Sequence, residues 1–422
     1  MRRTALLALA CLLMALPGPL ATAAETGEIS LCIVPGGTFA VKRITGPYSK
    51  LGAAFGDVVA WIGENGLVID GRGRSLFHDD PKALPEEKLR SEAWIPVRID
   101  PKKPAPKPAC GVEIHIEPPR LVLRAVHHGP AGEIASTFDR LFRSIPNRGV
   151  KYVGPSTHVY LNDLQSTPPA DHRIEARIQV EPTGPVDVGI YAGRGAFPEF
   201  VLALSTRLSA GKISIRPIGP DEITDGKLAK RCRCLLMPGG WAANYRADLG
   251  KVGAKRIREF VTKGNGYIGI CAGAFFAAKR IVWEGESIPY PLDLFPGVPT
   301  GPIPKIAPWP EFALTKISLD TKHQITKGFP KERTVLYYGG PVLEPLRKGA
   351  VKVLARFGKD GDPAIVAFSR GRGRVFLSSV HLEVCLGHDR EAIGWPPGEV
   401  ENPDPEQDAE LLRRGAAWVL RL

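Results

Sequence analysis

The feature that most constrains the fold is an apolar segment, Gly266–Ala278, with a cysteine near its centre. Gly269 and Gly273 lie two residues before and after Cys271. This spacing is typical of a nucleophile elbow, a sharp turn from a strand into a helix where larger side chains at those two positions would collide. The turn would place the thiol at a helix N-terminus, which favours thiolate, and would present the backbone N–H of Ala272 to an oxyanion. The alternative is a buried cysteine that only packs between strand and helix.

Two further motifs supply the partners that a nucleophilic cysteine needs. The segment Gly373–Glu383 predicts a buried strand that delivers a histidine, with a carboxylate two residues later. The histidine can serve as the base, and the carboxylate can orient its ring. The segment Leu235–Trp241 predicts another strand, ending in a Gly-Gly turn whose N–H groups could complete an oxyanion hole. The candidate site therefore has three catalytic residues and two oxyanion donors: Cys271, His381, Glu383, Gly240 and Ala272.

Together these motifs resemble the class I glutamine amidotransferase-like fold, in the branch found as the N-terminal domain of some biotin–protein ligases. The resemblance covers residues from about 186 to 422 and is carried by Met237–Gly240, Gly264–Ala274, Leu294–Gly297 with Gly301–Pro302, Tyr337–Pro341 and His381–Glu383. It implies a Cys-His-Glu triad. The family usually has proline between the histidine and the glutamate, where this chain has Leu382. No ligase catalytic domain follows in the sequence, so we do not expect biotinylation.

The rest of this region alternates between strand and helix patterns. Strands are expected at 186–191, 212–218 and 233–237, and helices at 198–208 and 250–262. This alternation predicts an α/β fold with a flavodoxin-like, doubly wound parallel sheet, whose sites lie at the carboxyl ends of the strands. Further strands at 312–319, 334–338, 351–357 and 364–368 and a helix at 404–420 complete the domain. The Pro-rich residues 284–312 predict either an excursion over the rim of the site or a plain surface loop.

Residues 28 to about 182 contain an internal repeat with an offset of 83 residues. Nine positions match without a gap, one of them a Phe/Tyr pair: 46/129, 47/130, 77/160, 80/163, 85/168, 90/173, 92/175, 95/178 and 97/180. Each copy predicts strand, helix, strand, strand, an α+β unit. The helices are expected near 49–65 and 131–146, and the closing strands at 93–97 and 177–180. The Pro- and Lys-rich residues 101–108 join the copies as a stiff linker.

This duplicated segment resembles the GyrI-like small-molecule-binding domain. Its carrying residues are Gly129–Pro130, Thr157–Tyr160, Asp163, Thr167–Pro169 and Glu175 with the strand after it. The resemblance implies two copies side by side and a cleft for a small, often cationic or aromatic, ligand. Tyr160 and Glu175 are the candidates for lining that cleft, because an aromatic face and a carboxylate suit a cation. The alternative places Tyr160 in the core and pairs Glu175 with Arg173 or Arg177.

The first residues predict a secretory signal peptide at 1–24. Arg2 and Arg3 precede an apolar run at 5–16, and Ala21–Ala23 offers a cleavage site. The run is short for a membrane span, so we expect export to the periplasm or medium, without a stable membrane span after cleavage. Domains are then expected at 25–182 and 183–422. Cys32 and Cys110 are the pair to test for a disulfide, and Cys232 and Cys234 should share one face of a strand.

Charge and motif content narrow the partners. The formal net charge of +12 falls to about +10 after removal of the signal peptide, and the basic residues are dispersed, which favours a solvated surface over nucleic-acid binding. No metal or other cofactor is expected, because no His or Cys set has ligand spacing. The primary hypothesis is a Cys-His-Glu amide hydrolase or amidotransferase-like enzyme, acting on an amide-containing substrate and coupled to a small-molecule-binding domain. The alternative is a non-catalytic periplasmic sensor or ligand-binding protein.

Overall fold

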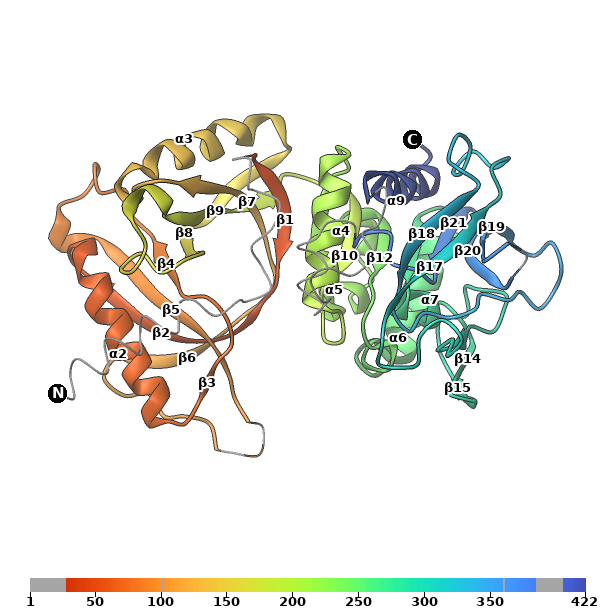
Figure 1. Ribbon diagram of the computed structural model, residues 1–422, viewed down its shortest axis with the longest axis horizontal. Coiled ribbons are helices and arrows are strands. Elements are labelled where there is room, and N and C mark those ends of the chain that lie inside the picture. The colour runs from red at the N-terminus through yellow and green to blue at the C-terminus, as the bar shows by residue number, and fades with distance from the viewer. Residues whose placement is uncertain (1–27, 101, 103, 360, 385–404) are drawn as a thin grey trace. The chain divides into compact units, whose positions relative to one another are not determined.

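A computed structural model describes residues 28–100, 102, 104–359, 361–384 and 405–422. The chain divides into two compact units, Met1–Thr183 and Gly184–Leu422, and Figure 1 shows each with its own sheet and helices. The predicted signal peptide and Cys385 lie outside the described residues. Within the described part of the chain, no helix combines the length and apolar character needed to cross a membrane.

Unit 1 contains a nine-stranded antiparallel sheet in the order β1-β7-β9-β8-β4-β5-β2-β6, with β3 paired to β5. Its strands are β1 (Ser30–Val34), β2 (Gly37–Thr45), β3 (Val68–Ile69), β4 (Arg74–Phe77), β5 (Arg90–Arg98), β6 (Val112–Glu117), β7 (Arg120–His128), β8 (Val150–Tyr160) and β9 (Arg173–Pro182). The predicted strand–helix–strand–strand repeat is present as β2-α2-β4-β5 and β7-α3-β8-β9.

The two copies meet where β4 pairs with β8. Arg74 lies opposite Val159 and Leu76 opposite Thr157, so the offset of 83 residues maps each pair onto the other. This is the signature of a pseudo-twofold axis between the copies. The strand that precedes each copy in the chain also crosses to the other copy, since β1 pairs with β7 of the second copy and β6 pairs with β2 of the first. The copies therefore exchange strands rather than only packing side by side.

Both helices of unit 1 lie against the same face of its sheet. They are α2 (Leu51–Glu64) and α3 (Ala135–Ser144). Buried residues of α2 recur at helical spacing, Leu51, Ala54, Phe55, Val58 and Ile62, and pack against alternate residues of β2 and β5 such as Ala40, Ala93 and Ile95. The intervening residues of those strands point to the opposite side, which we call the helix-free face.

Cys32 and Cys110, the pair to test for a disulfide, are not bonded to each other in the structure. Both thiols are free, and Cys32 is buried in β1 whereas Cys110 is exposed in the turn before β6. Strand exchange accounts for this, because β1 and β6 lie at opposite ends of the sheet order. The expectation for Cys232 and Cys234 is confirmed, since both are buried on one face of their strand while Arg233 between them is exposed.

Unit 2 is built on a mixed nine-stranded sheet in the order β11-β10-β12-β13-β21-β20-β19-β17-β18. Its strands are β10 (Val186–Tyr191), β11 (Ile215–Ile218), β12 (Cys232–Met237), β13 (Gly266–Ile270), β17 (Ala313–Leu319), β18 (Glu332–Tyr337), β19 (Lys352–Phe357), β20 (Pro363–Arg370) and β21 (Gly373–Ser378). The pairings from β11 to β21 are parallel, as predicted for an α/β domain, and the remaining four strands extend the sheet with antiparallel pairings.

A separate three-stranded sheet, β15-β14-β16, includes the first part of the region predicted as an excursion, since β15 and β16 lie within residues 284–312 and β14 directly precedes them. It is formed by β14 (Arg280–Trp283), β15 (Glu286–Pro289) and β16 (Thr300–Gly301). The helices of unit 2 are α4 (Pro198–Ala210), α5 (Pro220–Thr224), α6 (Ala242–Thr262), α7 (Ala272–Phe276) and α9 (Pro405–Leu420). Helix α6 starts eight residues before the predicted helix, and the predicted start at Gly250 is a non-helical kink with φ 51°.

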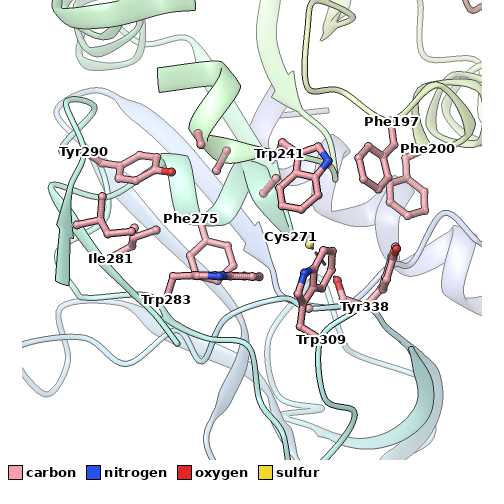
Figure 2. Close-up of a pocket in the computed structure, with 16 residues that line it drawn as sticks. Phe197, Phe200, Trp241, Cys271, Phe275, Ile281, Trp283, Tyr290, Trp309 and Tyr338 are labelled. Carbon is pink, nitrogen blue, oxygen red and sulfur yellow. Dashed lines mark hydrogen bonds between the residues drawn. The ribbon is translucent and has the colours of Figure 1, made fainter. Parts of the chain in front are cut away.

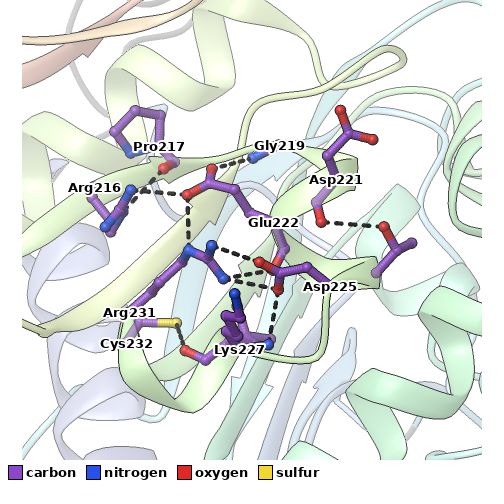
Figure 3. Close-up of polar contacts among 11 residues, drawn as sticks. Arg216, Pro217, Gly219, Asp221, Glu222, Asp225, Lys227, Arg231 and Cys232 are labelled. Atoms are coloured by element: carbon purple, nitrogen blue, oxygen red, sulfur yellow. Dashed lines mark hydrogen bonds and ion pairs between the residues drawn. The ribbon is translucent and has the colours of Figure 1, made fainter.

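A polar network anchors the crossover from β11 to β12. Glu222 of α5 accepts a hydrogen bond from the backbone N–H of Gly219 at 3.0 Å and pairs with Arg216 at 2.9 Å. Arg231 reaches Glu222 at 3.2 Å and Asp225 at 2.7 Å (Figure 3). These contacts cap a helix of only one turn and hold β12, whose carboxyl end leads into the Gly-Gly turn of the candidate site.

Candidate active site at the carboxyl ends of the parallel strands

The strand–turn–helix predicted around Cys271 is present. Strand β13 ends at Ile270, Cys271 adopts φ 50° and ψ −104°, and α7 begins at the next residue. A Cβ on Gly273 would overlap the carbonyl of Met237, and one on Gly269 would overlap the backbone of Gly273. Both glycines are therefore needed for the close approach of α7 to the sheet, and the backbone at Cys271 is held in a conformation that non-glycine residues rarely adopt.

His381 and Glu383 follow β21, the strand beside β13 in the sheet. The imidazole Nδ1 lies 2.8 Å from the Glu383 carboxylate, and both side chains are fully buried. Leu382 between them is also buried, so leucine at the usual proline position is compatible with this pairing. The ring of Phe200 packs 4.2 Å from the imidazole, centroid to centroid. The imidazole is thus fixed by a carboxylate on one side and an aromatic ring on its face.

The charge environment favours a protonated His381. Burial acts to lower its pKa, but the Glu383 carboxylate and the nearby Cys271 thiol outweigh burial and raise the pKa to about 10. The Cys271 Sγ donates to the carbonyl of Tyr338 at 3.3 Å in this conformation. The Nε2 atom of His381 makes no hydrogen bond to another described residue. The sulfur and the imidazole therefore interact, and Nε2, which carries the second proton of the imidazolium, is free to exchange that proton with the sulfur or a substrate.

The two backbone groups predicted as oxyanion donors flank the same cysteine. Ala272 is the first residue of α7, so its N–H has no acceptor within the helix. Gly240 has φ 141°, and a Cβ there would overlap the carbonyl of Gly195. The bridge between Ala196 and Gly240 uses the N–H groups of Phe197 and Trp241, and the N–H of Gly240 has no backbone acceptor among the residues that the structure describes. Both positions line the pocket that contains Cys271.

That pocket is dominated by aromatic side chains. Eight of its sixteen lining residues are aromatic, and Figure 2 shows Cys271 among their rings: Phe197, Phe200, Trp241, Phe275, Trp283, Tyr290, Trp309 and Tyr338. The cavity measures about 140 Å³. Trp309 stacks on Tyr338 with centroids 5.3 Å apart and contacts Trp241 and Trp283 edge to face at 5.3 and 5.5 Å. Within the described part of the chain, no charged side chain lines it.

These aromatic residues were not among the predicted site residues, although the sequence held signals for some of them. Trp241 directly follows the Gly-Gly turn, and Tyr338 belongs to the Tyr337–Pro341 segment. Trp283 and Trp309 flank or belong to the Pro-rich residues 284–312, of which Ile288, Tyr290 and Trp309 line the pocket. The excursion over the rim was therefore the better of the two predictions for that region.

Comparison with known protein families gives one match in each of the two units. Residues 186–393 match the family described as "Biotin-protein ligase, N terminal", and residues 12–98 match the "GyrI-like small molecule binding domain". The protein joins a GyrI-like domain to a biotin–protein ligase N-terminal domain. Both parts of the predicted fusion are confirmed.

Two curated relatives match part of the chain. A Chlamydia muridarum protein described as uncharacterized is 34% identical over 159 residues, which cover 35% of this chain and 60% of the relative. The biotin–protein ligase of Schizosaccharomyces pombe is 28% identical over 163 residues, 35% of this chain and 25% of the relative. The chain thus spans less than two thirds of either relative. A solved glutamine amidotransferase is 20% identical, with 56% of this chain and 99% of that chain covered and a TM-score of 0.39.

In the GyrI-like domain the structure separates the two predicted ligand-binding residues. Tyr160 lies on the helix-covered face, where its ring packs 6.0 Å from that of Phe55 and its hydroxyl lies 2.6 Å from that of Ser75. Glu175 lies on the helix-free face, fully buried between Arg124 at 3.2 Å and Arg177. One small ligand cannot contact both residues through the sheet. Burial raises the pKa of Tyr160, whereas the two arginines overcome burial and lower the pKa of Glu175.

Proposed function

We propose that the biotin–protein ligase N-terminal domain is a cysteine-dependent acyl-transfer enzyme that hydrolyses an amide. The observations that carry this proposal are a strained Cys271 and the backbone of Gly240 and Ala272, which line one pocket, together with the buried imidazole of His381, which interacts with Cys271 and whose Nε2 has no hydrogen-bond partner among the described residues. A cysteine that served only for packing would require none of these features.

In the proposed reaction the sulfur of Cys271 bonds to the carbonyl carbon, and the N–H groups of Gly240 and Ala272 hold the resulting oxyanion. The proton of the thiol passes through His381 Nε2 to the leaving nitrogen, the C–N bond breaks, and the amine departs. Water then attacks the thioester, His381 accepts one of its protons and returns it to the sulfur, and the carboxylic acid leaves. Glu383 holds the ring so that Nε2 faces the sulfur.

The aromatic lining supports a particular substrate class. A free glutamine carries a charged amino group and a charged carboxylate, and both lose hydration on entering a pocket without charged partners. An apolar or aromatic acyl group instead gains contact with Trp241, Trp309 and Tyr338. We therefore propose an aromatic or apolar amide as the substrate, rather than glutamine.

Thiol alkylation by iodoacetamide at pH 6.5, read by peptide mass spectrometry, tests the reactive cysteine. We expect Cys271 to be alkylated at least about tenfold faster in the unmodified protein than in His381→Ala, because the imidazole no longer assists thiolate formation. Cys110, which is exposed and free, is an internal control whose rate should not change. Equal, slow alkylation of Cys271 in both proteins would favour the non-catalytic ligand-binding alternative.

Release of phenylacetic acid from phenylacetamide, compared with release of ammonia from glutamine, tests the substrate class. We expect turnover of the aromatic amide and none of glutamine, with loss of at least about a thousandfold in Cys271→Ser. Preferential turnover of glutamine would contradict the assignment while leaving the triad intact.

We also propose that the protein is exported and processed near Ala23. Support comes from the basic start, the apolar run and the Ala-x-Ala motif. N-terminal sequencing of the protein recovered from the periplasm or medium would give a mature start near residue 24 or 25. An intact N-terminus at Met1 in the cytoplasm would contradict export.

A further inference from the structure

We infer that the helix-free face of the GyrI-like domain binds a small anion that carries carboxylate or phosphate groups. Strand register places Arg74 of β4, Arg124 of β7 and Arg177 of β9 on this face, together with Glu175. Arg72 lies two residues before Arg74, and Arg120 lies four residues before Arg124 at the start of β7. Because alternate residues of a strand share a face, both belong to the same face as Arg74 and Arg124. The face therefore gathers arginines from both copies of the repeat.

Positive charge exceeds negative charge in this cluster. Glu175 pairs with Arg124 and Arg177, and Glu117 of β6 pairs with Arg74 and, at 3.6 Å, with Arg120. Arg72 and Arg173 add positive charge beside Glu175, whereas Glu92, the other buried carboxylate on this face, pairs with Arg43 at 3.6 Å, so guanidinium groups outnumber carboxylates. Buried charges of one sign are costly unless a counter-charge approaches, so the cluster is better satisfied with a bound anion.

Unused hydrogen-bond donors point to the same ligand. The Nε and Nη1 atoms of Arg72 and the Nε atom of Arg74 are buried, and none has an acceptor among the described residues. Arg74 is itself only 8% exposed. Its guanidinium lies 4.0 Å from the ring of Phe39 and 4.6 Å from that of Trp94, so its orientation is held by aromatic contacts. Guanidinium groups held in this way favour carboxylate and phosphate oxygens as acceptors.

The pKa directions agree with this geometry. Burial lowers the pKa of Arg74 to about 10, and the neighbouring Arg177 and Arg120 act in the same direction against Glu117. Burial also lowers the pKa of Arg72, and Glu175 is the charge that opposes it. A bound anion would relieve both groups.

The same contacts disfavour a cationic ligand, which the resemblance to GyrI-like domains had implied. Glu175 has no exposed surface and already pairs with two arginines, so it is not available to a ligand cation. A cation approaching this face would instead meet the excess arginine charge. The arginines around Glu175 therefore indicate an anionic ligand, although the Glu175 carboxylate alone would suggest a cation.

Isothermal titration of the full chain at constant ionic strength tests the inference, with sodium citrate, inorganic phosphate and tetraphenylphosphonium chloride as probes. We expect citrate or phosphate to bind and tetraphenylphosphonium not to bind. Arg72→Gln should weaken anion binding about tenfold or more, since it removes a charge-assisted donor, and it breaks no ion pair described here. Arg72→Lys should retain most of the affinity.

Arg98→Gln is the matched control. Arg98 is exposed and pairs with Asp70 at 2.6 Å, so its loss should leave anion affinity unchanged. Binding of tetraphenylphosphonium in place of the anions would overturn the inference, as would the absence of anion binding up to about 10 mM. An equal loss of affinity in Arg72→Gln and Arg98→Gln would also overturn it, because the effect would then come from net charge alone.

Discussion

Glu175 in unit 1 and Glu383 in unit 2 are both completely buried, yet their surroundings differ in kind. Glu175 pairs with Arg124 and Arg177, one on each of its oxygens. Glu383 pairs through one oxygen with His381, and its other oxygen has no hydrogen bond to a described residue. Arginine cannot give up its proton in a protein, whereas histidine can. One carboxylate is therefore locked in a permanent ion pair, and the other belongs to a pair whose charge can change during a reaction.

The largest expected effect is on stability at the locked site. Glu175→Gln leaves Arg124 and Arg177 buried without a counter-charge, so we expect the free energy of unfolding to fall by about 3–5 kcal/mol. Urea denaturation followed by circular dichroism measures this change. Glu181→Gln is the control: Glu181 lies on the same strand, is exposed and pairs with Lys151 only at 3.8 Å, so it should cost less than about 0.5 kcal/mol.

A smaller effect on stability is expected at the other carboxylate. Glu383→Gln removes the charge that keeps His381 protonated, but the imidazole can become neutral and still hydrogen-bond to the amide, so we expect a loss of about 1–3 kcal/mol. Alkylation of Cys271 should slow in the same variant, because the ring is no longer oriented. A loss of stability as large as that of Glu175→Gln would mean that the two sites do not differ as described.

Expressed for one pH unit, the smallest expected effect is a pH dependence that separates the two sites. The folded-state pKa of His381 is about 10, above its ordinary value, so the stability from this proton is fully present below about pH 6.5 and is lost as pH rises toward 10. We expect a slope of at most about 1.4 kcal/mol per pH unit between pH 7 and 9. Urea denaturation of the unmodified protein and of His381→Gln measures it, and the difference should decline with rising pH. A flat difference would contradict a protonated imidazole.

Glu175 should respond in the opposite direction. Its folded-state pKa is lowered, so its contribution is present above the ordinary glutamate value and is lost as pH falls through the lowered pKa. The stability difference between the unmodified protein and Glu175→Gln should therefore be constant from pH 6 to 8 and shrink in acid.

Much of unit 2 could be predicted because its signals are local. Gly269 and Gly273 at fixed distances from Cys271 predicted the elbow, since only glycine permits the backbone contacts there. His381 and Glu383 are two residues apart, so one strand end places them together. The four strands from β17 to β20 were predicted, but their antiparallel pairing and the aromatic pocket were not. Both depend on which distant segments meet, and an apolar residue pattern does not identify its partner.

Unit 1 shows the opposite balance. The repeat of 83 residues correctly predicted two equivalent strand–helix–strand–strand units, but it could not show that β1 and β6 exchange between them, because either pairing satisfies the same hydrophobic pattern. The prediction of one cleft lined by Tyr160 and Glu175 failed for the same reason. The sequence predicted residues with ligand-binding chemistry, but only the register of β8 against β9 shows that they lie on opposite faces of the sheet.

By itself, the sequence determined the two families, the repeat and the convergence of a cysteine, a histidine and a glutamate at strand ends. These follow from short-range rules of backbone geometry and from motif order along the chain. The tertiary structure alone decided the strand exchange, the aromatic lining around Cys271 and the excess of arginines over carboxylates on one sheet face. Pairing between distant strands sets which side chains become neighbours, and that choice is made by the summed burial and charge of the whole domain.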